Sequence, residues 1–361
     1  MKVVDLTAPR QALRVRIDPS PAYDFLACLY LVGAYDPRFG YEVPAAWVAR
    51  ARQRLGRELR ADLALLFPPR GRTLGVVGVL DGTTGASVEA FIGRVAATPA
   101  AALLELMLAQ TLAHPRDLPR LRAAIGGGRR AVEALLDAVH PDVDRRRVRR
   151  LLLLAPEEVQ ARLVRVLREG YARVYAPEAP TVVSLLARNA AQLARQAAAL
   201  PPAALVERAT GGFVIGPDAA LDAVVLAPTY YFRPYNLITA YRQVRVFIYP
   251  IELPAAREGP PPDLVRVYKA LGDETRLRIL RLLAQREMYL QEVARALRVS
   301  HVTALHHLAL LRAAHLVRVV DRGALKYYRL RPDRLREAAD QGLAFLTAAP
   351  AASGEGGYDG H

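Results

Sequence analysis

The chain has 361 residues, about half of them apolar, and a formal net charge of +15. This composition excludes a disordered chain, and the length predicts two or three domains. The charge suggests a polyanionic partner such as nucleic acid, although nearly all basic residues are arginines, a usage that a GC-rich genome also produces.

Targeting and redox signals are sparse. The single cysteine, Cys28, lies in an apolar run, which excludes an internal disulfide and any multi-cysteine zinc site. Residues 2–18 mix charged and apolar side chains, unlike a signal peptide, and no apolar run reaches bilayer length. We therefore expect a soluble, cytoplasmic protein with no membrane partner.

The first 200 residues show mostly helical spacing, interrupted by Pro and Gly at the joints. Pro19 and Pro21 end the first expected element. The expected elements are a strand at 11–18, a buried helix at 22–34, one or two amphipathic helices at 42–66, a glycine-rich connector at 71–85, several helices at 87–176 and a long helix at 181–200.

The pattern changes near Gly211 to β-branched and aromatic runs of strand length, at 212–215, 223–226 and 244–249. A Pro-rich linker follows. The predicted fold class is mainly α (α+β), with a helical domain and small sheet at 1–256, a linker at 257–262, a second domain at 263–347 and a disordered tail at 348–361.

The second domain begins with two helices. Residues 264–271 form the first, Gly272 ends it, and Asp273 caps the next. In this second helix the spacing predicts four inward side chains, namely Leu277, Ile279, Leu280 and Leu283.

Residues 290–316 contain two further helical patterns around the joint Arg298-Val299-Ser300. Ser300 stands where an N-cap is expected. The first helix turns Val293, Ala294 and Leu297 inward; the second turns Ala304, Leu308 and Leu311 inward and His301, Thr303 and His306 outward. This order predicts a helix-turn-helix whose second helix enters the DNA major groove. An ordinary αα-hairpin has the same pattern, so the flanking segments must decide between them.

Two strands, 317–320 and 325–330, follow and are joined by a turn at 321–324. Arg322 and Lys326 are placed to meet backbone phosphate. Residues 263–340 hold 16 Lys and Arg against 9 Asp and Glu. Two helices, a helix-turn-helix and a basic hairpin are the order of a winged-helix domain, which favours the DNA-binding interpretation.

Residues 264–330 resemble the ArsR family of winged-helix repressors. The similarity rests on the blocks 268–273, 275–280, 300–303 and 306–308, and on a wing ending in Lys326-Tyr327-Tyr328. The resemblance implies a homodimer on a near-palindromic double-stranded operator. It also implies operator contacts by Ser300, His301, Thr303 and His306, with His307 as a helix residue that approaches phosphate. The long N-terminal region resembles long-form relatives, without implying a ligand.

Two departures from the family argue against metal sensing. Residues 287–292 contain no cysteine, and the last helix, 333–345, lacks the Asp/His and Glu/His pairs of zinc-binding members. We expect no metal and no cofactor.

Two clusters upstream have open interpretations. Aromatic residues beside Arg233 either line a small-molecule pocket or form core. The arginines of 145–150 either touch DNA outside the operator or form a solvated helix face.

The preferred hypothesis is a sequence-specific transcriptional repressor, released from DNA when an effector binds the N-terminal domain. The alternatives are an enzyme tethered to a DNA-binding module and a sequence-indifferent architectural DNA binder. The sequence has no Gly-rich phosphate loop, nucleophile elbow or HExxH motif, so we expect no enzyme.

Overall fold

The computed structural model describes residues 13–68, 74–216, 221–253, 259–322 and 325–347. These residues fall into two compact units. Unit 1 runs to Glu252 and includes Asp321 and Arg322, and unit 2 runs from Leu253 to Val320 and continues from Leu325.

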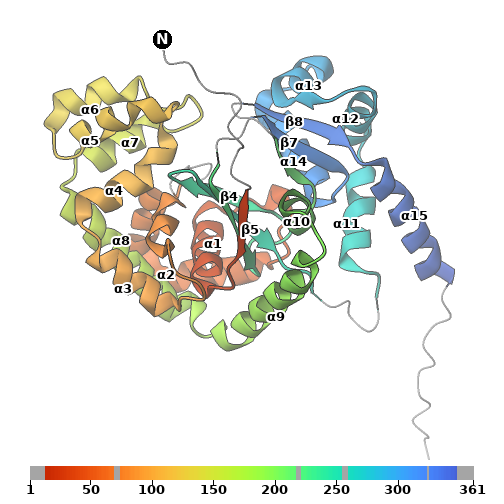
Figure 1. The fold of residues 1–361 in the computed structure, drawn as a ribbon, viewed down its shortest axis with the longest axis horizontal. Coiled ribbons are helices and arrows are strands. Elements are labelled where there is room, and N and C mark those ends of the chain that lie inside the picture. Colours follow the sequence, from red (N-terminus) through yellow and green to blue (C-terminus); the bar gives the residue numbers. More distant parts are fainter. Residues whose placement is uncertain (1–12, 69–73, 217–220, 254–258, 323–324, 348–361) are drawn as a thin grey trace, which may run out of the picture. The chain divides into compact units, whose positions relative to one another are not determined.

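Unit 1 is mostly helical (Figure 1). Its α-helices are α1 (Pro21–Ala34), α2 (Ala45–Leu66), α3 (Val88–Ala97), α4 (Ala100–Leu108), α5 (Leu118–Ala124), α6 (Gly128–Leu136), α7 (Arg145–Leu152), α8 (Pro156–Gly170), α9 (Ala179–Ala197) and α10 (Pro202–Ala209). Its strands are β1 (Arg14–Ile17), β2 (Phe213–Ile215), β3 (Ala223–Thr229), β4 (Leu237–Tyr241) and β5 (Val244–Pro250). Short 3-10 turns lie at Pro37–Phe39, Leu74–Leu80, Ala109–Thr111 and Pro115–Asp117, and a π-helical turn at Tyr171–Tyr175.

Four strands form the sheet of unit 1, in the order β1-β3-β5-β4. β1 and β3 pair in parallel, as do β3 and β5, with Arg14 opposite Ala223 and Ala223 opposite Val244. β4 runs antiparallel to β5. Because helices cover β3, its side chains from Val224 to Thr229 are all buried, as expected for a central strand.

α1 is buried on nearly every side, as the sequence predicts. Ser20 caps it and Pro21 occupies its first turn, where a missing N–H costs nothing. Its one acidic residue, Asp24, is fully buried. The carboxylate accepts hydrogen bonds from the Thr229 hydroxyl (2.6 Å), the Tyr230 N–H (2.8 Å), the Tyr231 N–H (3.2 Å) and the Tyr175 hydroxyl (3.0 Å). Asp24 therefore ties α1 to the end of β3 and to the π-helical turn.

The predicted glycine-rich connector differs from expectation within its described part. Residues 74–80 form a 3-10 turn whose apolar side chains are largely buried. A Cβ on Gly75 would lie 1.9 Å from the Leu106 carbonyl oxygen, so this turn packs directly against the backbone of α4. The glycine there permits close packing, and the segment is core.

Unit 2 holds the helices α11 (Pro262–Leu271), α12 (Glu274–Gln285), α13 (Leu290–Leu297), α14 (His301–Ala313) and α15 (Pro332–Thr347), and the strands β6 (Met288–Tyr289) and β8 (Leu325–Leu330). It also holds the strand β7 (Val317–Arg322) up to Val320, since the last two residues of β7 belong to unit 1. The strands lie in the order β7-β8-β6. β6 pairs antiparallel with β8, with Met288 opposite Tyr328. The inner face of α14 packs against α11, α12 and α13.

The prediction of a mainly α (α+β) fold is confirmed. One inward side chain was predicted wrongly: Leu277 is 49% exposed, whereas Ile279, Leu280 and Leu283 are buried as expected. Leu277 lies about 200° around the helix from Ile279, on the opposite face. Residues 11 and 12 of the first predicted strand, residues 257 and 258 of the predicted linker, and the predicted tail lie outside the described residues.

Within the described ranges, no single helix is long and apolar enough to cross a membrane; the bent pair Val88–Ala97 and Ala100–Thr111 reaches that length and composition only together.

Candidate DNA interface

The joint between α13 and α14 has the geometry of a tight helix-turn-helix. Arg298 adopts the left-handed conformation (φ 55°) at the end of α13, and the Val299 N–H donates to the Ala294 carbonyl at 3.1 Å. The Ser300 hydroxyl then caps α14, accepting from the Thr303 N–H at 3.0 Å. The predicted N-cap role of Ser300 is confirmed.

α14 presents a clear division between an inner and an outer face. Ala304, Leu308 and Leu311 are fully buried, as predicted. The first turn, His301 to Thr303, is exposed. Since the first residues of a recognition helix meet the base edges, the exposed turn is the part of unit 2 suited to that task.

The adjacent histidines His306 and His307 differ in their surroundings, although their ring centroids lie 5.8 Å apart. The His307 side chain is only 14% exposed, and its Nδ1 lies 3.8 Å from the Asp273 carboxylate that caps α12. Burial lowers the pKa of His307, which favours a neutral ring. His307 thus packs α14 onto the start of α12. His306 is half-buried, and its operator contact stays a prediction.

The two wing cations lie on successive strands, Arg322 at the end of β7 and Lys326 in β8, and both side chains are exposed. The short strand β6, which the sequence did not predict, adds a third strand beside β8 through Met288 and Tyr289. β6 leads directly into α13, and the Glu292 carboxylate accepts the Tyr289 N–H at 3.0 Å at that helix start.

Sequence reasoning missed two exposed residues at this surface. Val302 is 48% exposed between His301 and Thr303 although it is apolar, and Arg298 is exposed in the turn itself. An exposed apolar side chain in the first turn of a recognition helix matches contact with a thymine methyl group. The helical spacing alone gave no reason to single it out.

α14 is closed at its other end by His315, which adopts a left-handed conformation (φ 58°) and donates its N–H to the Arg312 carbonyl. Asp263, Arg266, Arg331 and Arg334 surround it electrostatically, and Arg334 pairs with Asp263. Burial, aided by these arginines, lowers the pKa of His315 to about 4.

Unit 2 is therefore expected to lose stability as the pH falls from about 6.5 to about 4, because the unfolded chain binds a proton at His315 that the folded chain excludes. The contribution is complete above pH 6.5 and amounts to about 3 kcal/mol at most. Urea unfolding followed by far-UV circular dichroism across this range should show a weaker pH dependence for His315→Asn, a residue that tolerates the left-handed conformation. Equal pH dependence in both proteins would contradict this role for His315.

In unit 1, the aromatic cluster beside Arg233 is packed as core. Tyr231 is fully buried, and the Arg233 guanidinium lies 4.0 Å from the centroid of the Tyr230 ring and pairs with Glu42 at 3.0 Å. These residues bond to one another and to the chain around them.

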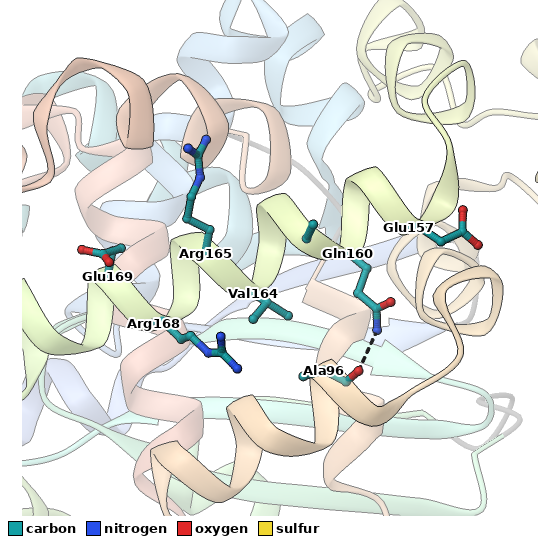
Figure 2. Close-up of a pocket in the computed structure, with 8 residues that line it drawn as sticks. Ala96, Glu157, Gln160, Val164, Arg165, Arg168 and Glu169 are labelled. Atoms are coloured by element: carbon teal, nitrogen blue, oxygen red, sulfur yellow. Dashed lines mark hydrogen bonds between the residues drawn. The ribbon is translucent and has the colours of Figure 1, made fainter.

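A pocket of about 500 Å³ lies instead on the exposed side of α8 (Figure 2). Gln160 donates to the carbonyls of Val95, Ala96 and Thr98, which closes the end of α3. Arg165 in the same lining pairs with Asp62 and Glu58. Much of the polar lining is therefore already engaged within the protein.

The five arginines of α7 fall into two groups, one buried and four exposed. Arg147 is 7% exposed and donates to the carbonyl oxygens of Leu65 (2.5 Å) and Leu66 (3.3 Å), which ends α2. Burial lowers the pKa of Arg147 to about 10. The other four arginines of this helix are exposed.

Among the residues that the structure describes, no group of three or more His, Cys, Asp or Glu side chains is placed to hold a metal ion. Cys28 is buried in α1, and burial raises the pKa of its thiol. Residues 287–292 correspond to the segment that carries cysteines in metal-sensing proteins of the ArsR family. Here Glu287 pairs with Arg329, and Glu292 pairs with Arg286.

The match to a family model lies in unit 2. Residues 273–319 match the family model described as bacterial regulatory protein, arsR family. The chain is 34% identical over 87 residues to a cadmium resistance transcriptional regulatory protein CadC homolog of Staphylococcus aureus, covering 24% of this chain and 70% of that protein.

Two further relatives are similar to the chain. The HTH-type transcriptional regulator KmtR of Mycobacterium tuberculosis is 37% identical over 83 residues, covering 22% of this chain and 64% of that protein. An uncharacterised HTH-type transcriptional regulator of Methanocaldococcus jannaschii is 36% identical over 72 residues, covering 20% of this chain and 81% of that protein. The matched segment contains the capped joint, the recognition helix α14 and the start of the wing. The chain is a transcriptional regulator of the ArsR family, with its helix-turn-helix DNA-binding domain in unit 2.

Proposed function

We propose that the protein is a dimeric, sequence-specific repressor in the cytoplasm, whose operator binding is controlled through the region before residue 257. The observation that carries the proposal is the exposed first turn of α14, held by a capped joint and by three packed helices. A helix fixed in this way offers its N-terminal side chains to the major groove with little loss of conformational entropy.

Base reading is assigned to His301, Val302, Thr303 and His306. His301 and His306 offer ring nitrogens for hydrogen bonds to bases, and Thr303 offers a hydroxyl group. Val302 offers an apolar contact for a thymine methyl group. Ser300 holds the helix start, and its hydroxyl retains the capacity for a phosphate contact. The proposed site is completed by three residues that lie beside the phosphate backbone of the DNA, namely Arg322, Lys326 and the packed His307.

The surface of α15 supports dimerisation. Leu343 is 64% exposed and Leu346 79% exposed, and with Leu335 and Ala339 they form an apolar stripe at helical spacing. The adjacent side of the helix, which holds the buried residues Arg334, Ala338 and Gly342, packs against α11, and a Cβ on Gly342 would lie 2.3 Å from the Tyr268 hydroxyl oxygen. An exposed apolar stripe on a helix that is already packed along a neighbouring side is typical of a subunit interface. Two recognition helices related by a two-fold axis match a near-palindromic operator.

The function divides between a regulatory part, 1–256, and a DNA-binding part, 263–347. An effector that binds better to the protein off DNA than on DNA would shift the population away from the operator. We propose control without a metal, since Glu287 and Glu292 are engaged in ion pairs with arginines.

Replacing His306 by alanine is expected to reduce the preference for operator over random DNA by about 1–3 kcal/mol, because a base contact is lost. Arg322→Ala should weaken binding to both DNAs equally and lower the salt slope by about 1, because a phosphate contact carries no sequence information. The measurement is fluorescence anisotropy on a duplex selected by the wild-type protein from a random pool, and on a scrambled duplex of the same composition. Equal losses on both duplexes for His306→Ala would remove this residue from base reading.

A further inference from the structure

The exposed side of α7 consists entirely of arginine. Arg145, Arg146, Arg149 and Arg150 are exposed, whereas the other four residues of the helix, Arg147, Val148, Leu151 and Leu152, are buried at 7% exposure or less. Arg146, Arg149 and Arg150 come one, four and five residues after Arg145, and this spacing places all four on one face of the helix.

α6 extends this face. Glu133 of α6 pairs with Arg149 of α7 at 2.6 Å, so the middles of the two helices lie side by side, and Arg129 and Arg130 are exposed one turn before Glu133. In Figure 1 the two helices form a lobe with α5 within unit 1. We call the exposed set Arg129, Arg130, Arg145, Arg146, Arg149 and Arg150 the arginine face.

Internal partners do not account for this charge. In the ranges that the structure describes, Arg129, Arg130, Arg145, Arg146 and Arg150 make no ion pair with an acidic side chain. Residues 115–152 hold ten arginines against five acidic residues. Of the five, Asp117 pairs with Arg120, Glu133 with Arg149, and Asp144 caps α7 by accepting two backbone N–H groups. The arginine face is therefore a concentration of largely uncompensated positive charge.

The placement of the charges also opposes the stability of their own helices. Arg145 and Arg146 are the first two residues of α7, and Arg129 and Arg130 lie in the first turn of α6. Cations in the first turn face the positive end of the helix dipole and destabilise the helix, and neighbouring arginines repel one another. Arginine is the preferred cation throughout this chain, and in α6 and α7 it clusters at positions that are unfavourable for the helix.

We propose that the arginine face is a second DNA-binding surface, which contacts the phosphate backbone of double-stranded DNA without reading sequence. Guanidinium groups bind phosphate oxygens through paired N–H donors, and several of them spread over one helix face can contact successive phosphates of the DNA backbone. Duplex DNA is the favoured polyanion because the ArsR-family domain of the same chain brings it close, so this inference rests on the proposed function. The surface adds affinity that is independent of sequence and sensitive to salt.

The test uses the full-length protein and a random-sequence 60-base-pair duplex, with affinity measured by anisotropy between 50 and 300 mM KCl. The first variant combines Arg130→Gln, Arg145→Gln, Arg146→Gln and Arg150→Gln, since glutamine keeps helix propensity and removes charge. The matched control combines Arg57→Gln, Arg188→Gln, Arg195→Gln and Arg208→Gln, four exposed arginines of unit 1 dispersed over α2, α9 and α10.

The first variant is expected to lower the slope of log affinity against log salt by about 3.6, because each of the four lost phosphate contacts removes about 0.9 from the slope. It should also weaken binding at 100 mM KCl roughly tenfold or more. The dispersed control should change affinity by about twofold or less. Unfolding followed by Trp47, the single tryptophan of the chain, should show the first variant to be no less stable than the wild type, since the lost charges oppose their helices.

Equal effects of the two variants, or an unchanged slope in the first, would overturn the proposal. So would a selective loss of affinity for a 60-nucleotide RNA, which would indicate a different nucleic acid. The ratio of operator to random affinity separates this proposal from the proposed function. The first variant should leave that ratio unchanged, while His306→Ala should lower it. A wild-type protein that binds the random duplex but shows no preferred sequence contradicts the repressor proposal and leaves the arginine face open to the same comparison of slopes.

Discussion

Replacing Asp24 by leucine is expected to unfold much of unit 1 or to lower its stability by at least about 4 kcal/mol. The substitution leaves four donors without an acceptor in a buried site, namely the hydroxyls of Thr229 and Tyr175 and the backbone N–H groups of Tyr230 and Tyr231. Each buried unsatisfied donor costs about 1–3 kcal/mol, and the whole stability of a domain is about 5–15 kcal/mol.

Trp47 reports this change directly. Its indole N–H donates to Glu178 at 2.6 Å, and Glu178 also accepts the Tyr231 hydroxyl at 3.0 Å, so the fluorophore belongs to the same packed region as Asp24. The measurement is urea unfolding followed by Trp47 fluorescence. An unfolding midpoint equal to that of the wild type would show that the four donors find other acceptors.

Asp24→Asn provides the matched control. The amide oxygen can accept the three bonds that Oδ1 receives, and the amide group can donate to the Tyr175 oxygen, so stability should change by about 1 kcal/mol or less. Burial raises the pKa of Asp24 in the folded protein above the value of about 3.8 expected in the unfolded chain. The stability that the protonated carboxyl contributes is therefore fully present below about pH 3.8, and it is lost as the pH rises through the pKa of the folded protein. The asparagine variant has no proton to lose and should lack this dependence.

The double substitution Leu343→Glu with Leu346→Glu is expected to convert the protein to a monomer and to weaken operator binding by about a hundredfold or more. Both side chains lie on the exposed apolar stripe of α15, where two glutamates per subunit would bring like charges together. In a dimer, binding of one subunit to its half-site raises the effective concentration of the other subunit at the second half-site. This linkage increases operator affinity by a factor of about 10²–10⁴, and a monomer lacks it. Analytical ultracentrifugation gives the oligomeric state, and anisotropy on the operator gives the affinity.

The control places the same two charges elsewhere on that helix, through Gln341→Glu and Ala344→Glu. Both positions are exposed and lie outside the stripe. This variant should retain the wild-type oligomeric state and bind the operator within a few-fold of it. A wild type that sediments as a monomer, or a stripe variant that stays dimeric, would contradict the interface assigned to α15.

The sequence was most informative in unit 2, where local signals agree with tertiary structure. Ser300 caps α14, Asp273 caps α12, and Ala304, Leu308 and Leu311 form the inner face, all as the pattern predicts. Caps depend on a side chain and a backbone group three residues apart, and an amphipathic face depends on periodicity. Both are local and can be read from one sequence.

Features that depend on distant partners were not accessible in this way. β4 was missed for a local reason, because its hairpin with β5 turns around Arg242, which adopts positive φ without being glycine, so the usual turn residue is absent. The Asp24 network joins residues about 150 and 205 positions apart. Leu277 was assigned to the core because leucine is apolar, although its position on α12 faces outward. The roles of Arg147 and His307 likewise depend on the helix ends that they contact.

The central claim is that the exposed first turn of α14 reads a specific DNA sequence. Footprinting of the purified protein on the promoter region of its own gene tests it most directly. The predicted result is a discrete protected segment with two related half-sites about one helical turn apart, which disappears for the double variant His301→Ala with Thr303→Ala. Uniform, weak protection along the whole fragment, unchanged in that variant, would contradict the claim.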